Sequence, residues 1–274
     1  MLKISCQSVG PQDAQTILFL HGGGVAGWMW EPVIARLPDF HCLVPDLPEH
    51  GQSQAVRPFS MALAAEQASE LVREQAHGGK AVVVGLSEGA QVAVEMLSTA
   101  PEGIERALVS SALLLPMPGA GWLASRWLLT WTYRLFIPPF RHSEWWMRLN
   151  MRQAAAIPDA FFPQYRATFQ ATTESQFVNL MLANQAYRLP GNLGKVTAPT
   201  LALAGKREYA VMKESARRLA AALPHGQARL VDLGRGASLA REHNWAMNAP
   251  DLFAQALRAF IAGSPLPPAL LPLD

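Results

Sequence analysis

The decapeptide AVVVGLSEGA, residues 81–90, carries the strongest fold signal in this 274-residue chain. Its first four residues are apolar and mostly β-branched, which predicts a buried strand. The pattern Gly-x-Ser-x-Gly follows at residues 85–89, and residues 91–97 are typical of a helix. A glycine at each end of the pattern lets strand and helix backbones approach closely across a sharp turn. The sequence therefore predicts a strand, a turn and a helix, with the Ser87 hydroxyl at the apex as a nucleophile.

Strands and helices are predicted to alternate on both sides of this turn. Further apolar segments typical of strands occur at residues 2–8, 16–20, 41–45, 106–110, 200–204 and 228–232. The proline-rich tail at residues 264–268 is expected to be extended. This alternation predicts an α/β fold, with a mostly parallel central sheet and helices on both of its faces.

The alternation stops at Pro116 and resumes near residue 190. The segment 116–190 contains helical pieces, prolines and five of the eight tryptophans, which are Trp122, Trp127, Trp131, Trp145 and Trp146. We therefore expect a helical cap at 116–190, above a core formed by residues 1–115 and 191–274, at the sheet edge where ligands bind. The aromatic residues could line a substrate pocket, anchor the cap to the core or, over residues 122–134, contact a membrane surface.

The composition is that of a globular protein without an evident macromolecular partner. Half of the residues are hydrophobic, and 23 basic residues face 21 acidic ones, a balance that argues against nucleic-acid binding. Cys6 and Cys42 lie in predicted strands and suggest buried, reduced thiols in a cytoplasmic protein. We see no signal-peptide pattern at the N-terminus and no uncharged apolar run long enough to predict a membrane span.

A serine nucleophile needs partners, and the sequence offers candidates at the ends of other strands. The motif HGGG at residues 21–24 follows a predicted strand, and its backbone N–H groups could stabilise a negative oxygen or simply form a flexible loop. Of the seven histidines, only His243 follows the last predicted strand. Glu208 lies in the loop after residues 200–204, whereas Asp232 lies at the end of the last strand, close to the wrong element.

Several segments together resemble the α/β-hydrolase fold superfamily over nearly the whole chain. They are HGGG (21–24), DLPEHGQS (46–53), GLSEG (85–89), PTL (199–201) with GKRE (205–208), and HNW (243–245) with APDLF (249–253). The resemblance implies a serine hydrolase of the esterase kind, with Ser87 as nucleophile, Glu208 as triad acid and His243 as general base. A serine hydrolase of this kind needs no metal ion and no organic cofactor.

The same resemblance implies an oxyanion hole formed by the backbone N–H groups of Gly23 and Glu88, with Gly24 as a substitute donor. Candidate substrate-binding residues are Gly24, Trp28 just after the glycine loop, Trp122 in the cap, and Trp245 beside the histidine. Several methionines in and beside the cap, namely Met117, Met147, Met151 and Met181, suggest an apolar or aromatic substrate moiety.

Three positions depart from the family pattern. Glu49 stands where members usually carry glycine, in what we expect to be a surface loop, and the triad acid is more often aspartate. The usual Gly-x-Gly-His turn reads GRGA at residues 234–237, so alanine occupies the expected histidine position. However, His243 lies seven residues before Pro250, as the family pattern requires, which predicts a small insertion at residues 238–242. Without that insertion, the chain would be a non-hydrolytic member.

Several functions remain open on the sequence alone. A serine at the turn argues against haloalkane dehalogenases and epoxide hydrolases, which use aspartate there. The same triad would also suit a C–C bond hydrolase, a lactonase or an acyltransferase, and Ala237 would suit a non-catalytic ligand-binding member. The expected partner is a small-molecule substrate, and a homo-oligomer is possible.

Overall fold

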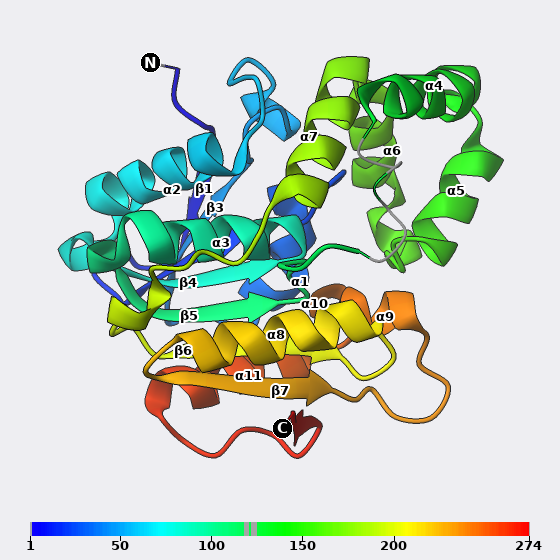
Figure 1. The fold of residues 1–274 in the computed structure, drawn as a ribbon. Coiled ribbons are helices and arrows are strands. Elements are labelled where there is room, and N and C mark those ends of the chain that lie inside the picture. Colours follow the sequence, from blue (N-terminus) through cyan, green and yellow to red (C-terminus); the bar gives the residue numbers. More distant parts are fainter. Residues whose placement is uncertain (1, 118–120, 122–124, 274) are drawn as a thin grey trace.

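The computed structural model describes residues 2–117, 121 and 125–273, and its centre is one eight-stranded sheet (Figure 1). The strand order is β1-β3-β2-β4-β5-β6-β7-β8. The strands from β3 to β7 in this order are parallel, and β1 and β8 pair antiparallel at the two edges. The strands are β1 (Cys6–Val9), β2 (Thr16–Leu20), β3 (His41–Pro45), β4 (Ala81–Leu86), β5 (Ile104–Ser110), β6 (Thr200–Gly205), β7 (Gly226–Val231) and β8 (Leu270–Pro272).

Helices cover both faces of this sheet, which confirms the predicted fold class. The core helices are α1 (Glu31–Ile34), α2 (Met61–Gln75), α3 (Glu88–Thr99), α8 (Ala210–Ala222), α9 (Leu239–His243), α10 (Trp245–Asn248) and α11 (Pro250–Ala262). The 3₁₀ turns include η1 (Gly27–Trp30), η2 (Gly51–Ser53) and η8 (Leu193–Lys195). In Figure 1, α2, α3 and α8 lie in front of the sheet and α11 lies behind it.

Alternation of side chains along the strands divides the apolar interior into two layers. In β2, Leu18 and Leu20 belong to the apolar layer that includes α2, α3 and α8, whereas Ile17 and Phe19 belong to the layer that includes η1, α1 and α11. All five residues of β2 are buried, as are all residues of β3, β4 and β6. Such continuous apolar runs are expected for parallel strands covered on both faces.

The strand order reverses direction at β2, and this reversal positions the site. From β2 the chain moves to β3 on one side, and it then returns to β4 on the other side. Loops leaving the carboxyl ends of β2 and β4 consequently diverge and leave a crevice between them. The HGGG loop follows β2 and the serine turn follows β4, so both predicted site elements lie at this crevice.

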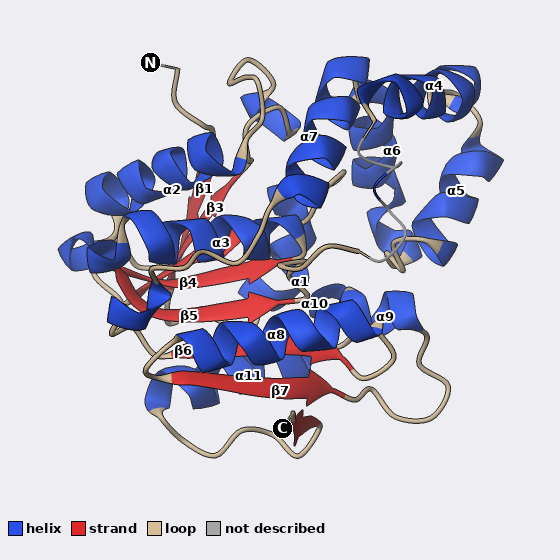
Figure 2. Cartoon of the chain, viewed as in Figure 1, coloured by secondary structure: helices blue, strands red, loops and turns tan. Residues whose placement is uncertain are grey.

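A helical cap occupies the segment between β5 and β6. Its described part contains α4 (Arg126–Phe136), α5 (Glu144–Gln153), α6 (Phe162–Ala171) and α7 (Glu174–Ala186), and it contains no strand. Figures 1 and 2 show these helices beyond the arrowheads of the strands, over the carboxyl edge of the sheet. A helical cap at this place agrees with the sequence prediction.

The edges of the sheet differ in detail from the prediction. The first strand is shorter than residues 2–8, and β5 and β7 each begin two residues earlier than predicted. The C-terminal tail was expected only to be extended, but it also forms a strand, because β8 pairs with β7 from Leu270 to Pro272. The prolines before it hid this strand, although an edge strand tolerates proline well.

Candidate active site

The backbone of the serine turn is strained. Ser87 has φ 57° and ψ −113°, a conformation that L-residues seldom adopt. A Cβ on Gly85 would overlap the backbone of Gly89, and a Cβ on Gly89 would overlap the carbonyl oxygens of Leu20 and His21. Both glycines are therefore required by close backbone contact, and the turn presents Ser87 at the N-terminus of α3.

The two predicted oxyanion donors lie beside this turn. A Cβ on Gly22 would lie 3.6 Å from the Cβ of Ser87, so the glycine loop passes directly over the serine. Within the described chain, the N–H groups of Gly23 and Glu88 donate to no protein acceptor. The Glu88 N–H also belongs to the first turn of α3, where the helix dipole favours negative charge. The arrangement is suited to stabilising an oxyanion.

Two buried histidines hold the glycine loop in place. His21 Nδ1 donates to the Gly22 carbonyl at 2.8 Å, and its Nε2 accepts the Leu47 N–H at 2.9 Å. The His50 ring contacts the His21 ring edge-on, with centroids 5.0 Å apart. Burial lowers the pKa of His21 to about 4 and that of His50 to about 3, so both remain neutral near pH 7. These histidines support the loop and are not candidates for the general base.

Glu88 carries a buried carboxyl group next to the oxyanion loop. Its side chain is enclosed, and its Oε2 lies 2.5 Å from the position that a Gly23 Cβ would occupy. Neither carboxyl oxygen has a hydrogen-bond partner among the described residues. Burial raises the pKa of this carboxyl well above its usual value. A protonated Glu88 places no negative charge beside the proposed oxyanion hole.

His243 and Glu208 are in direct contact. His243 Nδ1 lies 2.5 Å from Glu208 Oε1, and Glu208 Oε2 accepts the Ser111 hydroxyl at 2.9 Å and the Gly205 N–H at 2.5 Å. With Nδ1 donating to the carboxylate, Nε2 is left as the basic nitrogen of the imidazole. No hydrogen bond joins the Ser87 hydroxyl to this ring, a separation often found in unliganded sites.

The unusual segment before His243 is an additional short helix, α9, with its own anchor. Ser238 caps it by accepting the Arg241 N–H at 3.2 Å. Glu242 is fully buried, forms an ion pair with the Arg207 guanidinium and accepts the Arg207 N–H at 2.6 Å. Because Arg207 precedes Glu208, this pair ties the base-bearing helix to the acid-bearing loop.

Asp232, the other carboxylate considered as triad acid, pairs with Lys206 and Arg207. It accepts a hydrogen bond from Lys206 at 2.7 Å, which lowers the pKa of its carboxyl. Ser111, Arg207 and Glu242 are the positioning residues that sequence reasoning missed. The only local signal for Ser111 is its place directly after β5, beside the end of β6.

Ser87 and His243 both border two small cavities, of about 170 Å³ and about 260 Å³. The first lies on the oxyanion side and includes Gly22, Gly23 and Ile157. The second lies on the acid side and includes Glu208, Tyr209 and Met117. Neither lining includes a lysine or an arginine, and the described cap contributes no aromatic side chain to either. Of the three roles that the sequence leaves open for the cap aromatics, the described ones therefore do not line these two cavities.

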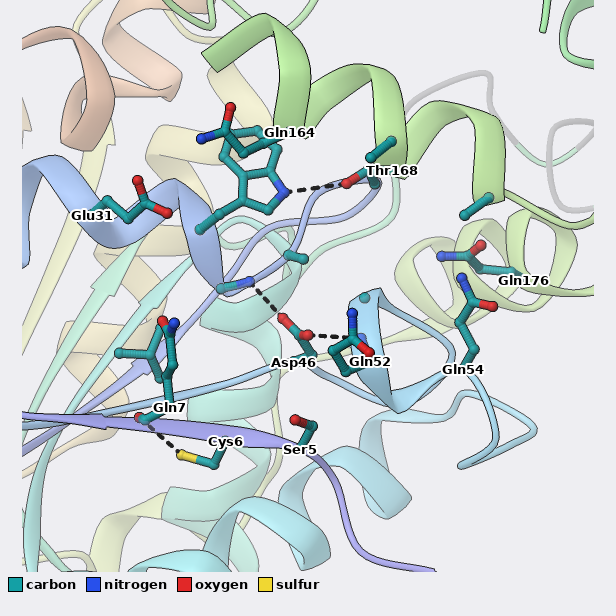
Figure 3. Close-up of a pocket in the computed structure, with 17 residues that line it drawn as sticks. Ser5, Cys6, Gln7, Glu31, Asp46, Gln52, Gln54, Gln164, Thr168 and Gln176 are labelled. Carbon is teal, nitrogen blue, oxygen red and sulfur yellow. Dashed lines mark hydrogen bonds between the residues drawn. The ribbon is translucent and has the colours of Figure 1, made fainter. Parts of the chain in front are cut away.

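Trp28 lies at a different place from the one predicted. It borders a separate groove of about 450 Å³ between η1, β1 and α6, which contains neither Ser87 nor His243 (Figure 3). Its indole N–H donates to the Thr168 hydroxyl at 3.2 Å, and its ring stacks on Phe161. Trp28 therefore fastens α6 to the core and forms no wall of the two cavities at the serine.

The other predicted substrate-binding residues also differ from expectation. Trp245 is fully buried, donates to the Ser110 hydroxyl at 3.0 Å and packs on Phe253, so it belongs to the core. Gly24 is exposed, has φ +70° and borders neither cavity. Trp122 lies outside the described residues. Aromatic identity alone did not reveal which face each residue would occupy.

Glu49 is buried, which contradicts the expected surface loop. It has a positive φ of 63°, where a glycine would be unstrained. Its carboxylate accepts the Phe59 N–H at 2.8 Å, the Asn179 amide at 3.1 Å and the Ser175 hydroxyl at 3.3 Å. Since Ser175 and Asn179 belong to α7, Glu49 binds the cap to the core.

Among the described residues, no helix is both long and apolar enough to cross a bilayer. In the same residues, no three His, Cys, Asp or Glu side chains gather in a group that could ligate a metal ion.

Comparison with known proteins places this geometry in a family. The chain matches the Alpha/beta hydrolase family over residues 17–257. A 2-hydroxy-6-oxononadienedioate/2-hydroxy-6-oxononatrienedioate hydrolase of Cupriavidus pinatubonensis is 25% identical, over 82% of this chain and 81% of that protein. An esterase of Mycobacterium tuberculosis is 36% identical over 33% of this chain and 30% of its own length. The chain spans about a third or less of several curated relatives that it matches.

Solved structures agree on the fold. The enol-lactonase of Burkholderia xenovorans superposes with a TM-score of 0.72 at 21% identity, covering 94% of this chain and 96% of that one. A thermophilic esterase of Thermogutta terrifontis has a TM-score of 0.67 at 20% identity, with 95% and 93% covered. The family match extends from β2 into α11 and includes the serine turn, the acid loop and the histidine helix. This chain therefore belongs to the alpha/beta hydrolase family.

Proposed function

We propose that the protein is a serine hydrolase that cleaves an ester or a related acyl bond of a small, apolar substrate. The observation that carries the proposal is the convergence of three chain segments. Ser87 stands on a strained turn and shares both of its cavities with His243, which contacts the buried carboxylate of Glu208. These are the nucleophile, base and orienting acid that acyl transfer requires.

In the proposed mechanism, Ser87 Oγ attacks the substrate carbonyl while His243 Nε2 takes its proton. Glu208 holds the ring and stabilises the imidazolium that forms. The Gly23 and Glu88 N–H groups stabilise the oxyanion of the tetrahedral intermediate. His243 then protonates the leaving group, and a water molecule, activated by the same ring, releases the acyl group from Ser87.

The linings of the two cavities support a small, uncharged substrate. Apolar side chains from the core and the cap segment 154–157 dominate the oxyanion side. Because neither lining supplies a lysine or an arginine, a substrate carboxylate would lose its hydration without gaining a cationic partner.

A second candidate is the hydrolysis of a C–C bond in a diketone by the same three residues. It is favoured by the relative from Cupriavidus pinatubonensis, which matches over most of its length. The name of that relative's substrate denotes a dicarboxylate, however, and both cavities lack a lysine or an arginine that would pair with a carboxylate, which favours the ester.

The test combines active-site labelling with a substrate panel. We expect a fluorophosphonate probe to label Ser87, and we expect Ser87→Ala and His243→Ala to abolish labelling. On short-chain p-nitrophenyl esters, Ser87→Ala should lower kcat/KM by roughly 10⁴-fold or more.

A matched panel of neutral esters, lactones and dicarboxylate diketones separates the candidates. Faster turnover of the diketones would favour C–C hydrolysis over ester hydrolysis. Wild-type activity in Ser87→Ala would refute the serine mechanism, and an unlabelled wild-type protein would indicate a ligand-binding member of the fold.

A further inference from the structure

The outer surface of the cap exposes an unusual set of large apolar side chains. Nine such side chains are exposed among the described residues, and six of them lie on two cap helices. We call these six residues the outer cap face: Trp127, Trp131, Leu135 and Phe136 on α4, with Trp145 and Leu149 on α5. Trp127 and Trp145 are 70% and 69% exposed, so most of the surface of each residue is in contact with water.

The exposure follows a helical period and is not the ragged edge of a core. On α4, Leu129 and Tyr133 are buried on the inner side, whereas Trp127, Trp131 and Leu135 repeat every four residues on the outer side. On α5, Met147 and Met151 are buried and Trp145 and Leu149 are exposed. A helix that faces water normally carries polar residues on its outer side.

Aromatic contacts connect the two helices into one continuous surface. Trp127 packs edge-on against Trp131, Phe136 stacks on Trp146, and Trp146 contacts Trp145. In Figure 1, α4 and α5 form the part of the cap that is farthest from the sheet, and α7 lies between α4 and the core. Nothing in the fold requires these side chains to be apolar, so their exposure indicates a binding surface.

The charge of the cap identifies the kind of surface that it fits. Residues 116–190 contain seven arginines and three carboxylates, a net charge of +4, whereas the rest of the chain has a net charge of −2. Arg126 and Arg134 on α4 and Arg152 on α5 are exposed on the same two helices as the outer cap face. Tryptophan favours the headgroup region of a bilayer, and arginines beside it attract anionic lipids.

We propose that the outer cap face docks on the headgroup region of an anionic lipid bilayer. The tryptophans would enter the interface while the arginines contact lipid phosphates and carboxylates, and the chain would lie on the membrane without crossing it. This surface does not include Ser87, His243 or Glu208, so the proposal is independent of the reaction that they catalyse.

The test is co-sedimentation of the full chain with vesicles of phosphatidylcholine alone or mixed with phosphatidylserine. We expect binding to the mixed vesicles, weakened by high salt, and quenching of tryptophan fluorescence by brominated lipid. The triple variant Trp127→Ser/Trp131→Ser/Trp145→Ser should bind at least about tenfold more weakly. Because these rings are exposed, its thermal unfolding should match that of the wild type.

Two further variants make the result specific. Arg126→Gln/Arg134→Gln/Arg152→Gln should retain the tryptophans and lose the preference for phosphatidylserine. Leu2→Ser/Val9→Ser, which removes exposed apolar side chains outside the cap, should bind like the wild type. Equal binding to both vesicle types would overturn the anionic assignment. A dimer that the tryptophan variant converts to a monomer, without vesicle binding by the wild type, would assign the surface to a second copy of the chain.

Discussion

The two halves of the candidate site are held by different physical means. The serine half is fixed by backbone sterics, since Gly85 and Gly89 allow contacts that no side chain would permit. The acid–base half is fixed by side-chain interactions, in which Ser111 holds Glu208 and the pair of Arg207 and Glu242 holds α9. We therefore expect the glycines of the serine half to tolerate almost no substitution. The side chains of the acid–base half can be substituted when the residues that they contact are substituted with them.

The largest effect is expected where the acid–base half meets the chemistry. Glu208→Gln keeps the size of the side chain but removes the charge that orients His243 and stabilises its protonated form. We expect kcat to fall roughly 10³–10⁴-fold, by analogy with amide substitutions of triad acids. The matched control is Glu144→Gln, which alters a carboxylate on α5 that is 57% exposed and lies outside both cavities. Comparable losses in both variants would contradict the assignment of Glu208.

The serine half can be broken with a single methyl group. In Gly89→Ala, the new Cβ would overlap the carbonyl oxygens of Leu20 and His21, so β2 and α3 must separate. We expect activity to fall roughly 100-fold and stability to fall by about 3 kcal/mol, measured by ester hydrolysis and urea unfolding. Gly194→Ala, whose Cβ meets open space in η8, serves as the control. A fully active Gly89→Ala would show that backbone contact does not position the serine.

Removing the ion pair between Arg207 and Glu242, which anchors α9, should lower both stability and kcat by an intermediate amount. Glu242→Gln leaves the Arg207 guanidinium with a neutral partner, and the loss is moderated because Arg207 is about one-third exposed. We expect a loss of about 1–3 kcal/mol in unfolding free energy. Since α9 carries the base, kcat should fall roughly tenfold while KM changes little. An equal fall in stability with unchanged kcat would show that Glu242 is only structural.

The smallest effect concerns the pH dependence of stability. Burial raises the pKa of Glu88 in the folded state above its ordinary value of 4.5. Above pH 4.5, the unfolded chain releases this proton and the folded protein retains it, so stability falls as pH rises toward the folded pKa. Glu88→Gln has no titratable carboxyl group at this position and therefore lacks this pH-dependent loss of stability. The melting temperature of the variant should therefore gain on that of the wild type between pH 5 and pH 8, and a constant difference across this range would contradict a protonated Glu88.

The difference between the serine half, fixed by the backbone, and the acid–base half, fixed by side chains, explains what could be predicted from the sequence. The serine turn and the sheet were predictable, because glycine spacing and β-branched runs report directly on backbone geometry. His243 could be singled out by its place after the last predicted strand and by its distance to Pro250, since α9 replaces the usual turn. The partners Ser111, Arg207 and Glu242 come from separate segments, and nothing local indicates that they meet.

Aromatic residues were the least predictable part of the site. Trp28, Trp245 and the tryptophans of α4 have the same apolar character, yet they lie in a groove, in the core and on the surface. The difference depends on which side of each element faces the sheet, and the sequence does not specify this for short helices.

The hydrogen bonds of Glu49 oppose separation of α7 from the core. If α7 swung away from the core, the buried carboxylate would lose the Ser175 hydroxyl and the Asn179 amide. Each hydrogen bond to a charged group is worth about 1.5–3 kcal/mol, so an open cap would be roughly 10²–10⁴-fold rarer than with glycine at this position. We therefore expect the cap to stay closed on the core for almost all of the time.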